Sequence, residues 1–425
     1  MIEYSQENKK VYLLGVHLKS QKLEVTISSL EELESIARSL DFDIIGKMHQ
    51  SRVSPDSKSY FGQGKLNEIK DIIASEKIDI VLFDHDLSPN QGKYIETYLD
   101  CLVLDRTQLI LEIFAQHAKT PESKNQVELA QLKYMLPRLV GMWAHLDREK
   151  GGIGASKGTG EKQINIDRTL IRKRIHHLEA TLQKVAMERK VQNKKRSDCF
   201  QVGIVGYTNA GKTSLMNGLT GVELLAQDKL FATLESTTRI LSDTQSPNIL
   251  LSDTVGFIRN LPHSLVASFR STLSVVRDAD LLLHVVDGSS PDLKEHIRTT
   301  EEVLKEIGAS NIPVLLVLNK IDQVIEEMDS MILTKEYAEA IFCSARNEEL
   351  INLLKQKITH FFNQKMIQKE TTIPYRHAGL VSKLYQISRV ENIAYEEHGI
   401  QVSHAMTQIN ERILEKILHE MSLIN

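Results

Sequence analysis

The chain has 425 residues and a formal net charge of −4, with 41% hydrophobic and 25% charged residues. At roughly 150 residues per domain this length predicts about three domains, and the composition is ordinary for a globular protein. Because the chain is slightly acidic overall, its total charge does not indicate a nucleic-acid partner.

Three cysteines, Cys101, Cys199 and Cys343, lie far apart and lack the spacing of zinc ligands, which predicts free thiols in a reducing cytoplasm. The N-terminal residues carry no long apolar stretch after their charges, and no segment approaches 18 consecutive apolar residues. We therefore expect a cytoplasmic protein without a signal peptide or a membrane span.

The N-terminal part of the chain alternates between strand-like and helix-like segments. Apolar runs that favour buried strands lie at residues 11–18, 78–84 and 101–105. Helices are predicted at residues 29–40, where Ser29 and Glu32 have the spacing of a capping box, and at residues 88–99. This alternation predicts a parallel sheet, so we expect an N-terminal α/β subdomain over residues 1–110.

Residues 106–148 have a helical pattern, and a glycine-rich patch, GGIGASKGTGE, follows at residues 151–161. An apolar stripe with the spacing of one helix face comes next, at Ile171, Ile175, Leu178, Leu182 and Val185. Two helices joined by a short connection usually pack antiparallel. We therefore predict a helical hairpin over residues 111–197 with a glycine-rich tip, and we expect Pro137 to kink or end its first arm.

The predicted hairpin is locally basic. Residues 148–196 hold 14 lysine and arginine residues against five acidic ones. Such a run is often only a solvated helix face, but beside a glycine-rich tip it also suits neutralisation of RNA phosphates. The patch follows a helix rather than a strand, so it is not expected to bind a dinucleotide.

Residues 206–213, GYTNAGKT, match the phosphate-binding pattern G-x-x-x-x-G-K-[ST]. The apolar run 201–205 supplies the strand that precedes such a loop, and a helix is expected to follow it. Backbone N–H groups of the loop converge on phosphate oxygens, and the helix N-terminus adds partial positive charge. We expect Lys212 to reach the β- and γ-phosphates and the Thr213 hydroxyl to ligate Mg²⁺; the alternative is a glycine turn without a ligand.

Two further predicted strands end in side chains that suit a guanine nucleotide. Residues 248–256 end in Asp-x-x-Gly, where Asp253 is expected to hold Mg²⁺ through water and the Gly256 N–H to meet the γ-phosphate. Residues 312–322 end in Asn-Lys-Ile-Asp. The Asp322 carboxylate would accept hydrogen bonds from N1–H and the 2-amino group of guanine, two donors that adenine lacks.

The remaining base contacts come from two neighbouring segments. Asn319 is expected to support the base from its other side, and the stem of Lys320 to lie over the ring. Residues 343–346 offer a backbone N–H near Ala345 to the guanine carbonyl. The order of these elements predicts a P-loop GTPase domain over residues 198–368.

Residues 228–238, DKLFATLESTT, lie where the first switch of such a domain belongs. This segment should supply a threonine to Mg²⁺, and spacing leaves Thr233, Thr237 and Thr238 as candidates.

Phe257 stands where Ras-like enzymes carry the glutamine that orients the attacking water. A phenyl ring cannot hydrogen-bond water in this way, so hydrolysis by the protein alone is expected to be slow. Asn209 resembles the asparagine that binds K⁺ in potassium-activated GTPases, so a K⁺ ion could supply positive charge; alternatively, Asn209 only holds the shape of the loop.

Residues 371–425 have the pattern strand, helix, strand, helix, which predicts a small C-terminal α+β domain over residues 369–425. The expected fold class is therefore α/β: a P-loop GTPase domain preceded by an α/β domain with a helical hairpin and followed by a small α+β domain.

Motifs outside the P-loop occur at residues 103–107 (VLDRT), 126–139 (QVELAQLKYMLPRL), 151–154 (GGIG), 160–161 (GE), 166–168 (IDR), 231–235 (FATLE) and 253–262 (DTVGFIRNLP). Together with the P-loop and the motif NKID, they resemble the motifs of HflX-type GTPases, and the similarity runs over nearly the whole chain. The tip departs from the family pattern, because Thr159 replaces a proline and Thr169 replaces a second arginine.

The resemblance identifies Thr233 as the switch residue that binds Mg²⁺. Together with Lys212 and Gly256, which the motifs point to, it is a candidate for a role in hydrolysis. The expected metal ligands are therefore Thr213, from the phosphate-binding motif, and Thr233, from the resemblance. The nucleotide-contacting residues expected on this basis are Gly206, Tyr207, Thr208, Asn209, Ala210, Gly211, Lys212, Thr213, Phe231, Ala232, Thr233, Leu234, Glu235, Asp253, Thr254, Val255, Gly256, Asn319, Lys320, Ile321, Asp322, Ser344, Ala345 and Arg346.

The resemblance also implies a monomer that binds GTP or GDP together with the large ribosomal subunit and its ribosomal RNA. The hairpin would lie near the peptidyl-transferase region, and GTP binding would split stalled or idle ribosomes under stress, with hydrolysis stimulated by the ribosome and used for release. Two alternatives stay open: a potassium-activated GTPase acting in RNA modification or ribosome assembly, and a ribosome-silencing factor that binds GTP without using it.

Overall fold

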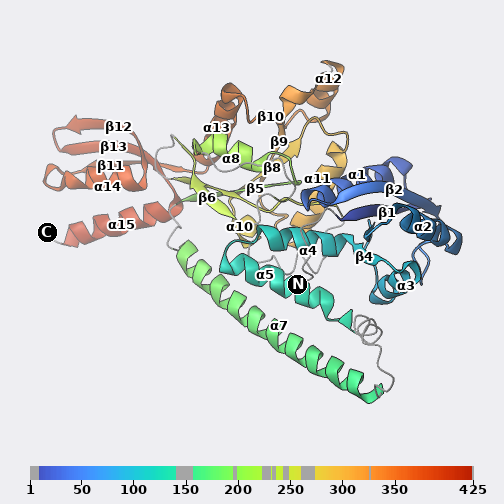
Figure 1. The fold of residues 1–425 in the computed structure, drawn as a ribbon. Helices are drawn as coiled ribbons and strands as arrows, with labels where there is room; N and C mark the ends of the chain where they lie inside the picture. The colour runs from blue at the N-terminus through green and yellow to red at the C-terminus, as the bar shows by residue number, and fades with distance from the viewer. Residues whose placement is uncertain are drawn as a thin grey trace. The chain divides into compact units, whose positions relative to one another are not determined.

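Figure 1 shows the computed structural model of the chain, which describes residues 9–139, 157–194, 199–222, 231, 236–242, 248–259, 273–324 and 327–423. The chain divides into two compact units. The first unit comprises residues 1–185, 228–234 and 259–270, and the second comprises residues 186–227, 235–258 and 271–425. Two short segments that follow the P-loop in sequence therefore belong with the N-terminal residues.

The first unit contains a four-stranded parallel sheet with the strand order β2-β1-β3-β4. Its strands are β1 (Lys10–Leu18), β2 (Asp43–Arg52), β3 (Ile80–Phe83) and β4 (Leu102–Asp105), and the connecting helices are α1 (Leu23–Ser39), α2 (Gln63–Glu76) and α3 (Pro89–Leu99). All four residues of β3 are buried, as expected of a central strand in a parallel sheet. The predicted parallel α/β sheet is confirmed.

The capping box predicted at Ser29 and Glu32 is wrong. Helix α1 begins at Leu23, so both residues lie inside the helix. Their side chains contact a buried guanidinium instead: Arg106 Nη1 donates to Ser29 Oγ at 3.4 Å, and Arg106 Nη2 pairs with Glu32. A polar side chain that resembles a cap in the sequence is thus used for tertiary packing.

In the described part of the chain, the sheet of the first unit is followed by the helices α4 (Arg106–His117), α5 (Pro121–Met135) and α7 (Lys157–Lys194). Helix α5 ends two residues before Pro137, which confirms the predicted end of the first arm. Helices α5 and α7 lie side by side and run in opposite directions (Figure 1). The predicted helical hairpin is therefore present.

An apolar seam joins α5 to α7, and it consists of Leu129, Leu132, Leu136, Ile171, Ile175, Leu178 and Leu182. Val185, the last residue of the predicted stripe, is not part of this cluster. Ion pairs flank the seam, since Arg174 pairs with Glu128 at 2.7 Å and Lys133 pairs with Glu179 at 2.8 Å. Apolar spacing on one helix face thus sets the packing of the hairpin.

The glycine-rich tip is only partly described. Helix α7 begins at Lys157, so residues 157–161, which were predicted as part of the tip, are helical instead. Residues 151–156 lie outside the described residues, as do residues 195–198 of the segment after α7.

The second unit contains a six-stranded sheet with the order β10-β9-β8-β5-β7-β6. Its strands are β5 (Phe200–Gly206), β6 (Thr237–Ile240), β7 (Ile249–Asp253), β8 (Leu281–Asp287), β9 (Val314–Asn319) and β10 (Ile341–Phe342). All neighbouring strands are parallel except β6, which runs antiparallel to β7. Strand β5 therefore lies inside the sheet, with its carboxyl end beside those of β7 and β8.

The helices that belong to this sheet are α8 (Lys212–Thr220), α10 (Ser274–Arg277), α11 (Leu293–Glu306), α12 (Glu327–Glu336) and α13 (Glu348–Asn363), with a short 3-10 turn at Ile321–Gln323. Helices α8 and α13 share one core cluster with the sheet, through Leu215, Met216, Leu219, Ile351 and Leu354. The strand–loop–helix context predicted for the P-loop, β5 followed by α8, is present.

The C-terminal residues form a separate antiparallel sheet with the order β11-β13-β12. Its elements are β11 (Ile367–Ile373), a 3-10 turn (Tyr375–His377), α14 (Gly379–Ile387), β12 (Arg389–Glu396), β13 (Gly399–Met406) and α15 (Gln408–Leu423). The pattern predicted one strand fewer, because it took the β12–β13 hairpin as one strand. Gly399 follows the hairpin turn with φ +154°, where a Cβ atom would lie 2.6 Å from the carbonyl oxygen of Ile373.

Among the helices that the structure describes, no candidate membrane span is found. The three cysteines are free thiols.

Leu178→Ala should loosen the hairpin. Leu178 is 2% exposed and packs in the seam between α5 and α7, so removing its side chain should cost about 2–5 kcal/mol of local stability. Hydrogen–deuterium exchange of the two helices should report this loss. The matched control is Leu170→Ala on the same helix, where the side chain is 58% exposed and the change should stay within about 0.5 kcal/mol. Equal exchange rates in the two variants would contradict the packing of Leu178 between α5 and α7.

Candidate nucleotide-binding site

The phosphate-binding loop connects the carboxyl end of β5 to the first turn of α8. Gly206 has φ +148°, and a Cβ atom there would lie 2.0 Å from the carbonyl oxygen of Val285. Gly211, the residue before α8, has φ +85°, and its Cβ atom would lie 2.3 Å from Asn319 Nδ2. Both positions therefore require glycine. Successive backbone N–H groups in a turn of this kind can form a concave site for an anion.

Lys212 is buried at the start of α8. Its Nζ donates to the carbonyl oxygens of Tyr207, at 2.7 Å, and Gly206, at 3.2 Å. Burial lowers the pKa of Lys212 to about 8, and the nearby Asp253 carboxylate opposes this shift. An ammonium group held in this way is preorganised to receive phosphate oxygens, which would supply the negative charge that its surroundings largely lack.

Thr213 and Asp253 bring a hydroxyl and a carboxylate together. Thr213 Oγ1 donates to Asp253 Oδ2 at 2.7 Å, and Asp253 is the last residue of β7. A hydroxyl beside one carboxylate, next to a phosphate-binding loop, suits Mg²⁺, which prefers few protein oxygens together with substrate phosphates and water. The described residues contain no cluster of three or more histidine, cysteine, aspartate or glutamate side chains that could hold a metal ion.

Gly256 and Phe257 lie directly against the phosphate-binding loop. The Thr208 N–H donates to the Phe257 carbonyl at 2.8 Å, and the Phe257 N–H donates to the Gly206 carbonyl at 3.1 Å. A Cβ atom on Gly256 would lie 3.0 Å from Lys212 Nζ, so this glycine is next to the ammonium group. The Phe257 side chain is 1% exposed. It belongs to the core and cannot orient a water molecule.

The base-recognition residues are tied together by hydrogen bonds. Asn319 Nδ2 donates to the Ala210 carbonyl at 2.9 Å, and Asn319 Oδ1 accepts from the Ala345 N–H at 3.1 Å. Ser344 Oγ donates to Asp322 Oδ1 at 2.6 Å. Asn319 thus joins the phosphate loop to the segment after β10, while Ser344 orients the carboxylate that is expected to read guanine.

Two residues near the site, Asp287 and His284, were not predicted, and Cys343 of the predicted segment 343–346 has a further feature. Asp287, the last residue of β8, pairs with Lys320 Nζ at 2.8 Å and so holds the lysine of the NKID motif. His284 of β8 is 2% exposed, and burial together with the charge of Lys212 lowers its pKa to about 4. Cys343 is fully buried before Ser344, and burial raises the pKa of its thiol to about 11. The signal for Asp287 was its place at the end of an apolar run in a parallel sheet.

The structure brings most of the predicted site residues to the carboxyl edge of the second sheet. Arg346 is the least engaged of these, with its side chain 81% exposed and 3.8 Å from Asp322 Oδ2. Ala232, Thr233, Leu234 and Glu235 lie outside the described residues, so their predicted contacts stay predictions. Thr237 and Thr238, the alternative switch threonines, lie in β6; Thr238 Oγ1 shares a 2.9 Å hydrogen bond with Ser252 Oγ of β7.

Asp322→Asn should change the base preference. The amide would replace one acceptor with a donor, so binding of GTP should weaken by about 2–5 kcal/mol, as for truncation of one side of a buried charged hydrogen-bond pair. Xanthosine triphosphate, whose C2 carbonyl accepts a hydrogen bond, should bind better than GTP. Competition titrations with both nucleotides measure this, with ATP as the control for contacts to phosphate alone. Parent-like affinity for GTP would contradict the assignment of Asp322.

The affinity for GTP should depend on pH through Lys212. Because burial lowers the pKa of Lys212 to about 8, the side chain is mostly neutral above that pH. Binding of a phosphate group then requires the side chain to take up a proton first. GTP affinity should therefore fall as pH rises above about 8, approaching tenfold per unit, with proton uptake on binding. Guanosine carries the same base without phosphates and serves as the control in calorimetric titrations. Identical pH profiles for the two ligands would speak against Lys212.

Three known protein families match successive parts of the chain. Residues 27–115 match a family described as "GTP-binding GTPase N-terminal", residues 117–196 match "GTP-binding GTPase Middle Region", and residues 201–320 match "50S ribosome-binding GTPase". The third match spans the phosphate loop, Asp253 and Asn319.

Individual relatives match over nearly the full chain. The protein named "GTPase HflX" of Escherichia coli (strain K12) is 41% identical over 403 residues, which covers 94% of this chain and 93% of the relative. "GTPase HflX" of Alkalihalophilus pseudofirmus is 39% identical over 417 residues, covering 96% and 97%. A solved structure of a GTP-binding protein from Sulfolobus solfataricus in complex with GDP is 29% identical, with a TM-score of 0.41, and covers 84% of this chain and 99% of that one.

Members of such GTPase families generally use Mg²⁺, and the paired Thr213 hydroxyl and Asp253 carboxylate have the chemistry that this ion prefers. With a site built to bind GTP and relatives of this identity and coverage, the chain belongs to the HflX family of GTPases and hydrolyses GTP.

Proposed function

We propose that this GTPase acts as a cytoplasmic monomer that binds the large ribosomal subunit through its helical hairpin, splits or rescues ribosomes in its GTP form, and leaves after hydrolysis. The observation that carries the proposal is a set of exposed basic side chains on α7 that the hairpin itself does not use. The family match described as "50S ribosome-binding GTPase" supports the same partner.

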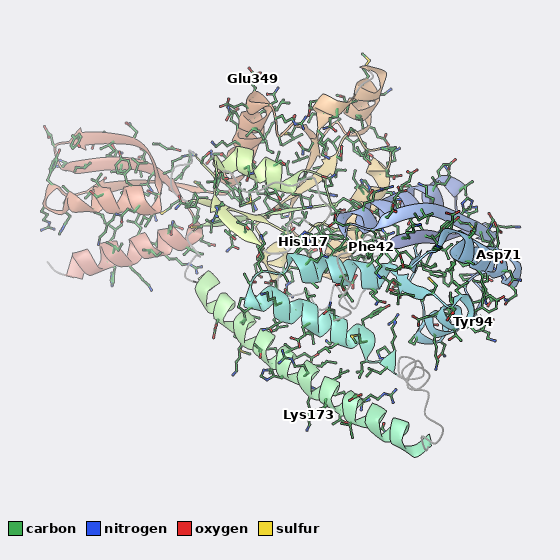
Figure 2. The ribbon with its side chains drawn as sticks, in the orientation of Figure 1. Phe42, Asp71, Tyr94, His117, Lys173 and Glu349 are labelled. Carbon is green, nitrogen blue, oxygen red and sulfur yellow. The ribbon has the colours of Figure 1, made fainter. Side chains whose placement is uncertain are left out.

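Helix α7 separates its apolar residues from its charged ones. Ile175, Leu178 and Leu182 face α5 in the seam. Arg172, Lys173 and Lys184 are exposed, and Figure 2 shows Lys173 on α7. Helical periodicity puts Lys173 and Lys184 close to the face opposite the seam, because eleven residues make about three turns.

Some of the basic side chains of α7 are engaged within the hairpin and are not available to a ligand. Arg174 forms two hydrogen bonds to the Glu128 carboxylate, each 2.7 Å long, so its guanidinium supports the hairpin. Within the described part of the chain, Arg172, Lys173 and Lys184 take part in none of the ion pairs found. Unpaired cations on an exposed helix face suit the phosphate backbone of RNA, which is recognised largely by charge and shape.

The nucleotide site offers a way to switch this contact. Gly256 lies next to Lys212, at the place where a γ-phosphate is expected, so GTP and GDP should favour different positions of the segment after β7. Since Phe257 is buried and cannot orient water, the protein alone should hydrolyse GTP slowly. The ribosome would then supply or position the missing group. We include K⁺ as a second cation because Asn209 is exposed at the loop turn with φ +59°; replacing K⁺ by Na⁺ in a turnover assay tests it.

Reversal of three exposed charges, Arg172, Lys173 and Lys184 to Glu, should weaken binding to the large subunit. Each lost phosphate contact should reduce the slope of log affinity against log salt by roughly 0.7–0.9. GTP affinity should be unchanged, because the phosphate loop belongs to the other compact unit. Co-sedimentation with purified large subunits at several salt concentrations measures the effect.

The matched control reverses three exposed lysines outside the hairpin, Lys305, Lys357 and Lys416. It changes the net charge equally and should leave the salt slope nearly unaltered. If both triple variants weaken binding to the large subunit equally, only net charge matters. If the hairpin variant keeps the parent's slope of log affinity against log salt, the basic side chains of α7 only face solvent.

Ribosome splitting should proceed with a non-hydrolysable GTP analogue, whereas release and recycling should not. The reason is that a γ-phosphate alone orders the switch segments, while its loss frees them. Light scattering of intact ribosomes, together with phosphate release with and without ribosomes, measures both steps. Lys212→Ala should lose GTP binding and splitting together. Fast hydrolysis by the protein alone, or ribosomes that neither accelerate hydrolysis nor dissociate, would overturn the proposal.

A further inference from the structure

The side-chain hydroxyl of Thr208 is buried in the phosphate-binding loop without a hydrogen-bond partner. Thr208 is the third residue of GYTNAGKT, and it is 6% exposed. Within the part of the chain that the structure describes, no group donates to its Oγ1 atom or accepts from it. Because buried polar groups are nearly always hydrogen-bonded, a hydroxyl kept in this state calls for an explanation.

The backbone of Thr208 is fixed on the core of the second unit. Its N–H donates to the Phe257 carbonyl at 2.8 Å, and the Phe257 N–H donates to the Gly206 carbonyl at 3.1 Å. Phe257 is itself 1% exposed. The loop and the segment after β7 are therefore tied together on both sides of Tyr207, and the Thr208 side chain is held where it is buried.

The side chain of Thr208 lies against Gly256. A Cβ atom on Gly256 would lie 2.8 Å from both Cα and Cγ2 of Thr208, and 3.0 Å from Lys212 Nζ. The methyl group of Thr208 and the ammonium of Lys212 thus meet at the same glycine. The hydroxyl is bonded to the same Cβ atom as that methyl group, so it belongs to the corner of the site where the γ-phosphate is expected.

An anionic oxygen is the partner that this corner favours. Lys212 Nζ already donates to the carbonyls of Gly206 and Tyr207, and its positive charge attracts phosphate oxygens. A threonine hydroxyl can donate a hydrogen bond to such an oxygen. The phosphate-binding pattern leaves the third position open to any residue, and its phosphate contacts come from backbone N–H groups and the lysine. A side-chain contact from Thr208 is therefore not implied by the motif.

We propose that Thr208 is a specificity-determining residue: its Oγ1 donates a hydrogen bond to a γ-phosphate oxygen and helps the protein to distinguish GTP from GDP. GDP has no γ-phosphate, so with GDP the hydroxyl stays unpaired. All the groups in this argument belong to the second unit.

The proposal separates stability from nucleotide preference. Valine has nearly the shape of threonine but no hydroxyl, so Thr208→Val removes a buried polar group that has no partner in the nucleotide-free protein. This change should leave the nucleotide-free protein as stable as the parent or make it more stable. The same change should weaken binding of the triphosphate. A hydroxyl with a purely structural role would give the opposite result, a less stable protein with an unchanged preference.

The test compares GDP with a non-hydrolysable GTP analogue in calorimetric titrations of the full chain with Mg²⁺. Thr208→Val should lower the affinity for the analogue roughly tenfold, which is the effect of one hydrogen bond to a charged group, and should leave the affinity for GDP unchanged. Thr208→Ser keeps the hydroxyl and should keep the parent's ratio of the two affinities. Thermal unfolding of the nucleotide-free protein should show a midpoint for Thr208→Val that is equal to the parent's or higher.

Thr220→Val is the matched control. Thr220 is 8% exposed at the end of α8, and its Oγ1 donates to the Met216 carbonyl at 2.8 Å. This variant should lose stability and keep the parent's ratio of affinities. Parent-like affinity of Thr208→Val for the analogue, an equal loss of affinity for GDP, or a lower unfolding midpoint than the parent's would overturn the proposal. Ribosomes take no part in these measurements, so the outcome does not depend on the proposed function.

Discussion

The ammonium group of Lys212 lies between two carbonyl oxygens of its own loop, near the carboxylate of Asp253, and burying such a charge is costly unless hydrogen bonds and opposite charge offset it. This requirement accounts for much of the second unit. Strand β5 must end in a turn that presents carbonyls inward, so Gly206 has to approach Val285 more closely than any side chain allows. Strand β7 must lie beside β5 and end at Asp253, and helix α8 must begin at the lysine itself.

The first unit contains a comparable buried cation. Arg106 is 1% exposed, with Asp84 and Glu32 as its ion-pair partners. A buried ion pair adds little net stability compared with apolar packing, but removing one partner is costly, so it can specify which elements meet. The preceding residue, Asp105, accepts from the Leu87 N–H and pairs with Arg138 beyond the end of α5. The motif LDRT thereby joins the sheet, helix α1 and the first arm of the hairpin.

Features set by neighbouring residues could be predicted from the sequence, and features set by distant ones could not. The phosphate loop, the end of α5 before Pro137 and the apolar seam of the hairpin depend on short spacings. The start of α1 was predicted at Ser29 because this residue has the spacing of a helix cap. Its side chain instead accepts a hydrogen bond from Arg106, which is 77 residues away in the sequence. Strand β2, partly exposed along most of its length, was missed for lack of a buried apolar run. The contact of Arg259 with Ser28 joins residues 231 positions apart, and no pattern of neighbouring residues predicts it.

Cys343 precedes the residues that hold the base-reading carboxylate, and it is a buried thiol whose pKa is raised to about 11. Oxidants and electrophiles react with thiolates rather than thiols, and at neutral pH a thiol with such a pKa is ionised to only about one part in ten thousand. Burial therefore keeps the sulfur next to Ser344 in its protonated form, which is the less reactive one. A buried thiol at this position adds apolar packing next to the expected guanine site without adding a reactive group.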